Sequence, residues 1–272
     1  MHRMENKVCI VTGAGRGIGK GIARRLLREG GRVLICDIKE ELLDETVAEL
    51  AIDGEIAGSA TDVSSRDQVQ AMIDGVVARW GRLDVMVNNA GIARANAFLD
   101  ITDTDWDRIM NTNLRGTFLC SQIGGRQMVA QGDGGSIVNI ASTNGTRGQA
   151  TLADYGASKA GIINLTQTCA LELGAYGIRV NAVCPGTIWN EMSAGTGWDD
   201  EIWNEIRSAT AIGRFGTPDD IAAAVAYLAA DEAGFVTGSI VVVDGGLTAR
   251  QLNLKSHQIV ERTQDGTQDS VC

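Results

Sequence analysis

The sequence has little proline, histidine or aromatic content, and it lacks a long apolar run. Of its 272 residues, 2 are proline, 2 are histidine and 4% are aromatic. Scarce proline leaves long helices uninterrupted. The two histidines lie near opposite ends and no Cys-x-x-Cys pair occurs, so we expect no metal site. The longest apolar stretches, such as Val33 to Cys36, are far too short to cross a bilayer.

Positive charge is also scarce. The chain carries 24 Lys and Arg against 34 Asp and Glu, a net charge of −10, which argues against nucleic acid or an anionic membrane as a partner. The six cysteines are scattered, and we expect reduced thiols, mostly buried, in a cytoplasmic protein. The first strand follows Met1 so closely that we expect no signal peptide.

Apolar runs that suit strands alternate with amphipathic patterns that suit helices. We expect strands at 7–12, 31–37, 56–61, 84–88, 135–140, 177–183 and 239–243, and helices at 17–29, 39–52, 65–80, 102–131, 153–176 and 218–230. This alternation predicts an α/β fold whose parallel sheet is covered on both faces. We expect one domain over residues 1–247, with a substrate flap at about 187–215, and a polar tail at 248–272.

A glycine-rich segment, TGAGRGIG at residues 12–19, follows the first predicted strand. Gly13, Gly17 and Gly19 fit Thr-Gly-x-x-x-Gly-x-Gly rather than G-x-G-x-x-G. Glycines let a turn approach a phosphate closely, and the N-terminus of the next helix supplies free N–H groups and partial positive charge. The segment therefore predicts a dinucleotide site. The alternative is a tight β–α connection without a ligand.

Asp37 ends the second predicted strand, 18 residues beyond Gly19. A carboxylate at this place suits the adenosine ribose hydroxyls and would repel a 2′-phosphate, which favours NAD over NADP. Arg16 opposes this choice because its guanidinium could pair with that phosphate. We expect Asp37 to dominate, since Arg16 can swing into solvent. The alternative for Asp37 is an ordinary residue of the turn.

Tyr155 and Lys159 are four positions apart on a predicted helix, so both lie on one face. A nearby cation favours phenolate over phenol. We therefore expect Lys159 to lower the pKa of Tyr155 and make an acid–base group that works near neutral pH. Taken alone, the pair also fits an ordinary amphipathic surface.

Further short segments follow the predicted strands in a set order. They are Asp62-Val63, Asn88-Asn89-Ala90-Gly91, Asn111 to Gly116, Ser142 at 13 residues before Tyr155, and Pro185-Gly186-Thr187. With these motifs the chain, from about Lys7 to Leu247, resembles the short-chain dehydrogenase/reductase family in its compact single-domain form. The resemblance implies a doubly wound (Rossmann), mostly parallel seven-stranded sheet with helices on both faces.

The resemblance also implies roles for individual residues. The catalytic set would be Asn113, Ser142, Tyr155 and Lys159. The cofactor would be NAD, held by Gly13, Arg16, Gly17, Ile18, Gly19, Asp37, Ile38, Asp62, Val63, Asn89, Ala90, Gly91, Tyr155, Lys159, Pro185, Gly186, Thr187 and Ile188. Ser142 as a strand-end cap and Asn113 as a helix-kink residue are the alternatives.

The substrate wall is expected from the segments around Ser142 and from the flap. The candidates are Ser142, Asn144, Gln149, Tyr155, Trp189 and Glu191. Polar groups here favour a small polyol, sugar or other hydroxylated alcohol or ketone. The flap tryptophans, including Trp189, could instead fill the contact between flap and core.

The resemblance implies a homodimer or homotetramer and an NAD-dependent enzyme that interconverts a secondary alcohol and a ketone. An NADPH-dependent 3-oxoacyl-thioester reductase is the alternative within enzymes, and Asp37 argues against it. A regulator that senses NAD without catalysis is a further alternative, and the intact catalytic set argues against it.

Overall fold

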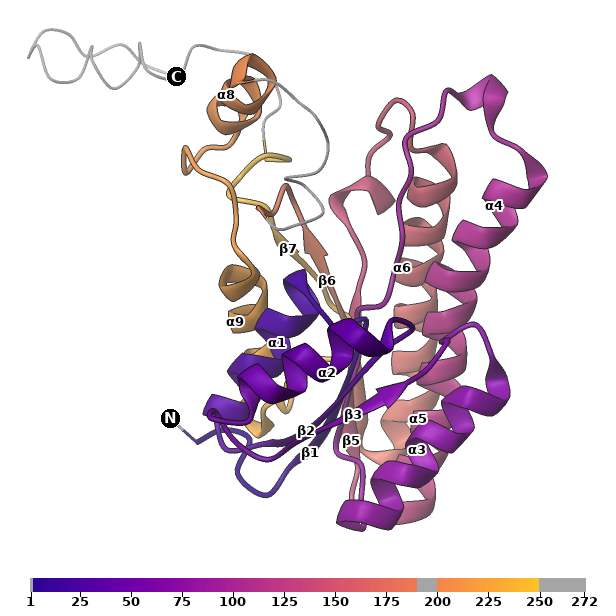
Figure 1. Ribbon diagram of the computed structural model, residues 1–272, viewed down its shortest axis with the longest axis vertical. Coiled ribbons are helices and arrows are strands. Elements are labelled where there is room, and N and C mark those ends of the chain that lie inside the picture. Colours follow the sequence, from indigo (N-terminus) through magenta and orange to yellow (C-terminus); the bar gives the residue numbers. More distant parts are fainter. Residues whose placement is uncertain (1, 190–199, 250–272) are drawn as a thin grey trace, which may run out of the picture.

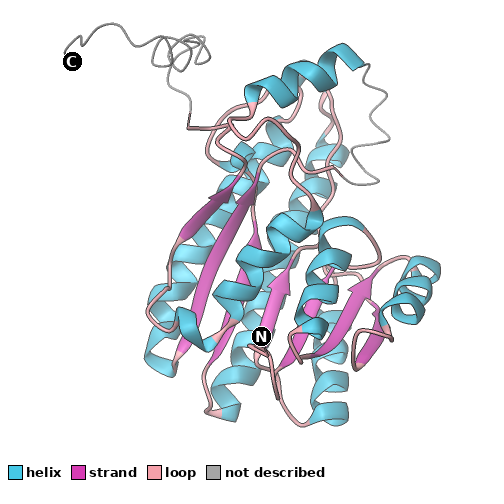
Figure 2. Ribbon diagram, turned by 90° about the vertical axis from the view of Figure 1, so that its left-hand side faces the viewer, coloured by secondary structure: helices cyan, strands magenta, loops and turns pink. Residues whose placement is uncertain are grey.

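Seven parallel strands form a single sheet in the computed structural model, in the order β3-β2-β1-β4-β5-β6-β7. The structure describes residues 2–189 and 200–249. The strands are β1 Val8–Thr12, β2 Arg32–Asp37, β3 Ile56–Ala60, β4 Val85–Asn88, β5 Gly135–Ile140, β6 Ile178–Pro185 and β7 Ile240–Val243. Their arrowheads point the same way, toward the end of the molecule that carries α8 (Figure 2). The predicted fold class is confirmed.

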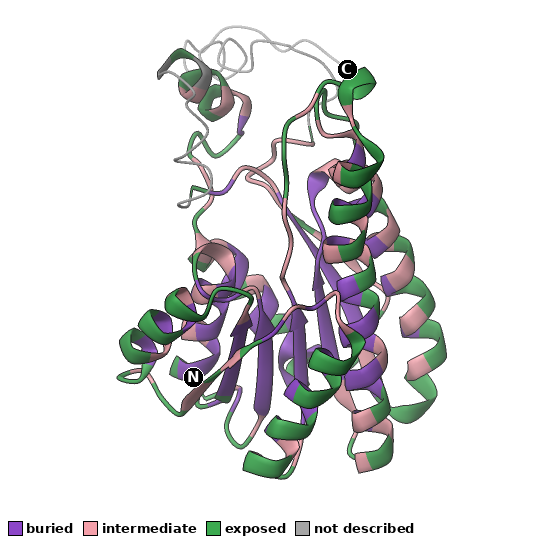
Figure 3. Ribbon diagram, turned by 45° about the vertical axis from the view of Figure 1, so that its right-hand side comes forward, coloured by how far each residue is buried: buried purple, intermediate pink, exposed green. Residues whose placement is uncertain are grey.

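Helices cover both faces of the sheet (Figure 1). The helices are α1 Gly17–Arg28, α2 Glu40–Leu50, α3 Arg66–Trp80, α4 Asp103–Ile109, α5 Gly116–Gln131, α6 Ala153–Leu173, α8 Asp200–Ala209 and α9 Pro218–Ala229, of which α8 lies beyond the end of the sheet rather than on a face. One core cluster joins α1, α2 and α9 to the sheet, and a second joins α3, α5 and α6 to the other face. Along β1, Cys9 and Val11 enter the first cluster while Val8 and Ile10 enter the second, as strand geometry requires. The central strands are buried, the edge strands β3 and β7 are only partly covered, and the outer faces of the helices are exposed (Figure 3).

The structure differs from the predicted elements in three places. The helix expected at 102–131 is interrupted between α4 and α5 by a π-helix, η2 (Met110–Arg115). The flap contains a helix, α8, that the sequence did not predict. Strand β6 continues to Pro185, so Cys184 lies inside the strand and is buried, rather than just beyond it. The reason is that Cys184 and Pro185 pair with Val242 and Val243 of β7.

Within the described ranges, no helix is both long and apolar enough to span a membrane. The cysteines described there are all free thiols, and every one except Cys169 is buried. Most of the expected tail, residues 250–272, lies outside the described residues.

The carboxylate of Glu29 ties the N-terminal segment to the end of α1. Glu29 is 4% exposed, and its oxygens accept two hydrogen bonds from Arg3 at 2.6 Å and one from Arg25 at 2.5 Å. Burial alone raises the pKa of Glu29, but the hydrogen bonds from the two arginines outweigh it, and the pKa is lowered. The folded state therefore favours the ionised form.

We expect Glu29→Gln to lower the free energy of unfolding by about 1–3 kcal/mol at pH 7, because the partly buried Arg3 and Arg25 lose a charged acceptor that is itself buried. Since the pKa is lower in the folded state, this contribution is present above the unfolded pKa of about 4.3 and is lost as pH falls through the folded value. Urea unfolding at pH 7 and at acid pH measures both effects. Glu232→Gln is the control, because Glu232 meets Arg3 at an exposed site, and equal losses in the two variants would contradict the assignment.

Candidate active site

Residues that follow six different strands gather at the carboxyl edge of the sheet. Because the strands are parallel and adjacent, their carboxyl ends lie along one edge, where open α/β sheets bind ligands. The residues that end or follow strands β1 to β6 at this edge are Gly13, Asp37, Asp62, Asn89, Ser142 and Pro185. The structure thus brings the predicted segments together.

The glycine-rich turn after β1 is packed too closely to admit side chains. Gly13 has a φ of +61°, and a Cβ there would lie 2.7 Å from the Cα of Ala90. A Cβ on Gly19 would lie 2.5 Å from the carbonyl oxygen of Gly13. Arg16 is the extended N-cap of α1 and makes no side-chain cap, and the first helical turn has no acidic residue. The free N–H groups of the first turn of α1, together with the helix dipole, thus suit an anion such as a pyrophosphate.

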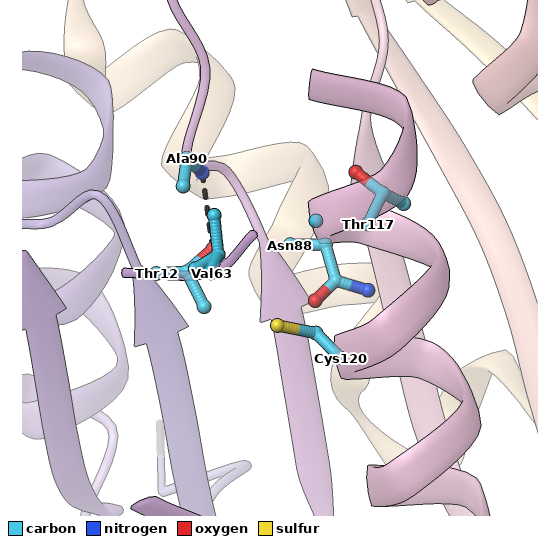
Figure 4. A pocket seen from close by; sticks show the side chains of 7 residues that line it. Thr12, Val63, Asn88, Ala90, Thr117 and Cys120 are labelled. Carbon is cyan, nitrogen blue, oxygen red and sulfur yellow. Dashed lines mark hydrogen bonds between the residues drawn. The ribbon is translucent and has the colours of Figure 1, made fainter. Parts of the chain in front are cut away.

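Thr12 and Asn89 fasten this turn to the segment after β4. The Thr12 hydroxyl accepts from the backbone N–H groups of Asn89 and Ala90, both at 3.0 Å, and the Asn89 amide donates to the carbonyls of Thr12 and Gly13 at 2.8 and 2.9 Å. The Thr12–Ala90 contact borders a small pocket between the sheet and α5, which Asn88 also lines (Figure 4). Asn89 and Ala90 thereby hold the shape of the glycine-rich turn. The role of Thr12 was not predicted, although its place at the head of the glycine motif was a signal.

The carboxylates of Asp37 and Asp62 both lie at strand ends. Asp37 accepts from the backbone N–H groups of Gly15 at 3.2 Å and Lys39 at 3.1 Å, so it is held beside the glycine turn. One oxygen of Asp62 accepts from the N–H and hydroxyl of Ser64 at 2.9 and 2.7 Å. The residues that follow the two aspartates differ in exposure, since Val63 is buried and Ile38 is 68% exposed.

Asn113 is fully buried in the π-helix η2. Its amide exchanges two hydrogen bonds with the backbone of Ile92, at 2.8 and 2.9 Å, and donates a third to the Ser158 hydroxyl at 3.1 Å. A Cβ on Gly91 would lie 3.3 Å from the Asn113 oxygen and 3.5 Å from the Lys159 ammonium. Asn113 therefore joins the segment after β4 to α6, close to Lys159. Interruptions of this kind recur at functional sites.

The Ser142 hydroxyl lies near the Tyr155 phenol and accepts a hydrogen bond from the Asn144 N–H at 3.1 Å. Burial raises the pKa of Tyr155, and the nearby Ser142 hydroxyl lowers it only in part.

Lys159 is 3% exposed, and its ammonium donates to the carbonyl of Ile140 at 2.8 Å. It lies 5.6 Å from the centroid of the Tyr155 ring. Burial lowers the pKa of Lys159 to about 8. The expectation that Lys159 lowers the pKa of Tyr155 is wrong for this structure: burial dominates the phenol, and the ammonium is directed to Ile140 instead. The predicted proximity of the two side chains is confirmed.

The base of the flap is anchored to the rest of the domain. Gly186 donates to the carbonyl of Val243 at 3.0 Å, and Trp189 donates to that of Gly216 at 2.8 Å. Ile188 is buried against Gly216, and a Cβ added to Gly216 would lie 2.4 Å from the Cδ1 of Ile188. Pro185 at the end of β6, and Gly186, Thr187 and Ile188 beyond it, therefore lie at a fixed place.

The predicted substrate residues meet different outcomes. Asn144 lies beside Ser142, whereas Gln149 is exposed. Trp189 is 48% exposed and packs on Trp203 and Phe215, with ring centroids 5.0 and 5.9 Å away. Glu191 lies outside the described residues. In the part of the chain that is described, no group of three or more His, Cys, Asp or Glu is arranged to hold a metal ion.

Comparisons with known proteins agree with this geometry. A family model described as enoyl-(acyl carrier protein) reductase matches residues 13–248. The chain is 40% identical over 246 residues to 3-oxoacyl-(acyl-carrier-protein) reductase FabG of Thermotoga maritima, which covers 90% of this chain and 99% of the relative. It is 38% identical over 247 residues to meso-2,3-butanediol dehydrogenase of Serratia marcescens, with 91% and 96% covered. The crystal structure of a short-chain type dehydrogenase/reductase from Mycobacterium marinum matches with a TM-score of 0.83 at 34% identity, with 91% and 97% covered.

The short 3-10 helix after Ser142, η3 (Thr143–Gly145), lies directly on the backbone of α6. A Cβ on Gly145 would be 2.8 Å from the carbonyl carbon and oxygen of Lys159. We expect Gly145→Ala to lower the free energy of unfolding by about 1–3 kcal/mol, because backbone atoms cannot yield as a flexible side chain can. Thermal unfolding measures the change. Gly148→Ala, in the same loop with nothing within 4 Å, is the control, and an equal effect in both variants would refute the packing argument.

Proposed function

The chain belongs to the short-chain dehydrogenase/reductase family, and from this premise we propose that it is an NAD-dependent oxidoreductase that interconverts a secondary alcohol and a ketone. Membership makes it an oxidoreductase of CH–OH groups that uses a nicotinamide cofactor. The observation that carries the proposal is the meeting of Asn113, Ser142, Tyr155 and Lys159, from three separate segments, beside the glycine cradle. The catalytic domain would span residues 1–247, with the tail at 248–272 outside it.

The residues present fit a dinucleotide. The cradle around Gly13 and Gly19 has no room for side chains, and free N–H groups begin α1. The Asp37 carboxylate, held beside Gly15, would accept hydrogen bonds from ribose hydroxyls and repel a 2′-phosphate, which supports NAD. The remaining contacts would come from Arg16, Gly17, Ile18, Ile38, Asp62, Val63, Asn89, Ala90, Gly91, Tyr155, Lys159, Pro185, Gly186, Thr187 and Ile188.

The chemistry needs a hydride and a proton to leave the carbinol together. A bound nicotinamide would accept the hydride in oxidation and supply it in reduction. The phenolate form of Tyr155 would take the hydroxyl proton as the carbonyl forms, and the phenol would return it in the reverse direction. Ser142, which lies near the phenol, would donate to the substrate oxygen. Lys159 would contact the cofactor ribose, and Asn113 would position a water that relays the proton from Lys159.

A second function is an NADPH-dependent 3-oxoacyl-thioester reductase. It is favoured by the 40% identity to a reductase of that name and by Arg16, exposed at the start of α1. The place of Asp37 opposes it. A non-catalytic NAD sensor would have no need of the complete catalytic set.

The proposed substrate is a small polyol, sugar or other hydroxylated compound. Similarity to a butanediol dehydrogenase supports a small hydroxylated substrate, as do Asn144 and Gln149 on the loop after Ser142. We place the enzyme in the cytoplasm, which its free thiols support. A homotetramer or homodimer is supported by apolar side chains exposed on α5, α6 and β7, namely Phe118, Leu171 and Val242.

We expect Tyr155→Phe to retain NAD affinity while turnover of secondary alcohols falls by about 10²- to 10⁴-fold, because the proton acceptor is removed and the ring remains. Steady-state absorbance of NADH and calorimetric titration with NAD measure the two quantities. Tyr176→Phe, at an exposed site on a 3-10 helix, should leave both unchanged. Near-normal turnover in Tyr155→Phe would exclude the role given to the phenol.

We expect Asp37→Ser to raise the ratio of NADP to NAD affinity by about 10- to 100-fold, because a fixed negative charge beside the 2′ position is removed. Competition binding of the two cofactors measures the ratio. Asp44→Ser on the exposed face of α2 carries the same charge change and should leave the ratio unaltered. A wild type that already prefers NADP would overturn the cofactor assignment and favour the second function.

A further inference from the structure

Arg147 lies on the loop between Ser142 and Tyr155 and is exposed. Its backbone N–H donates to the carbonyl of Thr143 at 3.1 Å, which fixes the start of the side chain close to Ser142. Its guanidinium donates to the backbone carbonyl of Thr248, in the turn that follows β7. The side chain therefore connects two segments that are far apart in the sequence.

Arg147 and Thr248 belong to segments on either side of β6 at the carboxyl edge of the sheet. The neighbouring strands are β5, β6 and β7, and Arg147 extends from the loop after β5 to the turn after β7. The contact therefore joins the two segments that flank the carboxyl end of β6, where Pro185 and Gly186 are placed.

The turn on the far side is well ordered by its own hydrogen bonds. The Asp244 carboxylate accepts from the N–H groups of Gly246 and Thr248 at 2.8 and 2.7 Å, and from the Thr248 hydroxyl at 2.6 Å. A Cβ on Gly186 would lie 2.6 Å from the Cβ of Asp244, so the turn rests on the segment after β6. Thr248 is therefore a fixed anchor beside the cleft, and the Asp244 charge is already satisfied.

The positive charge of Arg147 has no carboxylate partner within the described ranges, where its side chain makes only the contact with Thr248. Arg94 and Arg214, in contrast, pair with Asp105 and Asp220. A backbone carbonyl takes few of the five guanidinium donors and none of its charge. Among the described residues, Arg147 is thus a cation at the carboxyl edge of the sheet whose charge is left for an anionic ligand.

We propose that Arg147 binds a carboxylate of the substrate, so that the enzyme prefers small hydroxy acids and their keto acids; this rests on the proposed function. The planar guanidinium matches a carboxylate with two parallel hydrogen bonds. A single arginine in a chain of net charge −10 suits a monoanion better than a phosphate dianion. The Thr248 carbonyl lies where it can hold the guanidinium over the cleft until a carboxylate replaces it.

The test compares hydroxy acids with their methyl esters, which differ in charge at nearly constant shape. The probes are lactate, 3-hydroxybutyrate and 4-hydroxypentanoate, each with its ester, in the presence of NAD. We expect wild type to bind at least one acid more tightly than its ester. Arg147→Met should lower the affinity for that acid by about 10- to 100-fold, which corresponds to the loss of a charged hydrogen bond, and should leave the affinity for the ester unchanged. Arg147→Lys should recover part of the loss.

Calorimetric binding is the primary measurement, because it does not require turnover. Arg28→Met, which removes the same charge from the end of α1 remote from the site, controls for net charge and should bind the acid as wild type does. Equal weakening of acid and ester in Arg147→Met would show a structural brace only, and a wild-type preference for every ester would likewise overturn the proposal. Acid binding that depends on Arg147 without formation of NADH would uphold the carboxylate site and count against the proposed reaction.

Discussion

The hydrogen bond from the buried ammonium of Lys159 to the backbone of β5 is the interaction on which the site depends. It is 3% exposed, and its bond to the carbonyl of Ile140 at 2.8 Å ties α6 to the last residue of β5. Burying a charged ammonium is costly, and burial accordingly lowers the pKa of Lys159 to about 8. The contact also fixes Tyr155, one helical turn earlier, beside Ser142 at the end of the same strand. The alignment of α6 with the sheet thus sets the distance between Tyr155 and Ser142.

This alignment is possible because small residues let the backbones approach. Gly145 admits the loop after β5 onto Lys159, and Gly161 admits Leu114, whose side chain lies 2.8 Å from where a Cβ would stand. The π-helix then turns Asn113 toward Ile92 and Ser158, and its buried amide uses three hydrogen bonds there. Segments far apart in sequence are therefore held by satisfied polar groups rather than by apolar packing alone, which keeps a polar cleft rigid.

Sequence reasoning succeeded where local pattern and topology decide. All seven strands were predicted to within one or two residues, because parallel buried strands read as continuous apolar runs. The nearness of Ser142 to Tyr155 was implied by the family resemblance, through their spacing of 13 residues. The π-helix was not predicted because it depends on hydrogen bonds between Asn113 and a distant backbone segment. The raised pKa of Tyr155 was not predicted because burial is a property of the tertiary structure. The contact of Arg147 with Thr248 was not predicted because it joins residues about a hundred positions apart.

The aromatic and polar walls of the cleft have different tasks. The ring of Trp189 is engaged by Trp203 and Phe215, so much of its surface serves to hold the flap. The loop between Ser142 and Tyr155 is fixed instead to the opposite rim, through the carbonyl of Thr151 and the N–H of Asn96 at 2.9 Å. Thr151 adopts a φ of +68°, which is strained for a β-branched residue. A loop whose backbone is held in a costly conformation next to Ser142 and Tyr155 would be the better place for selecting substrates, because its backbone cannot adjust to fit the wrong one.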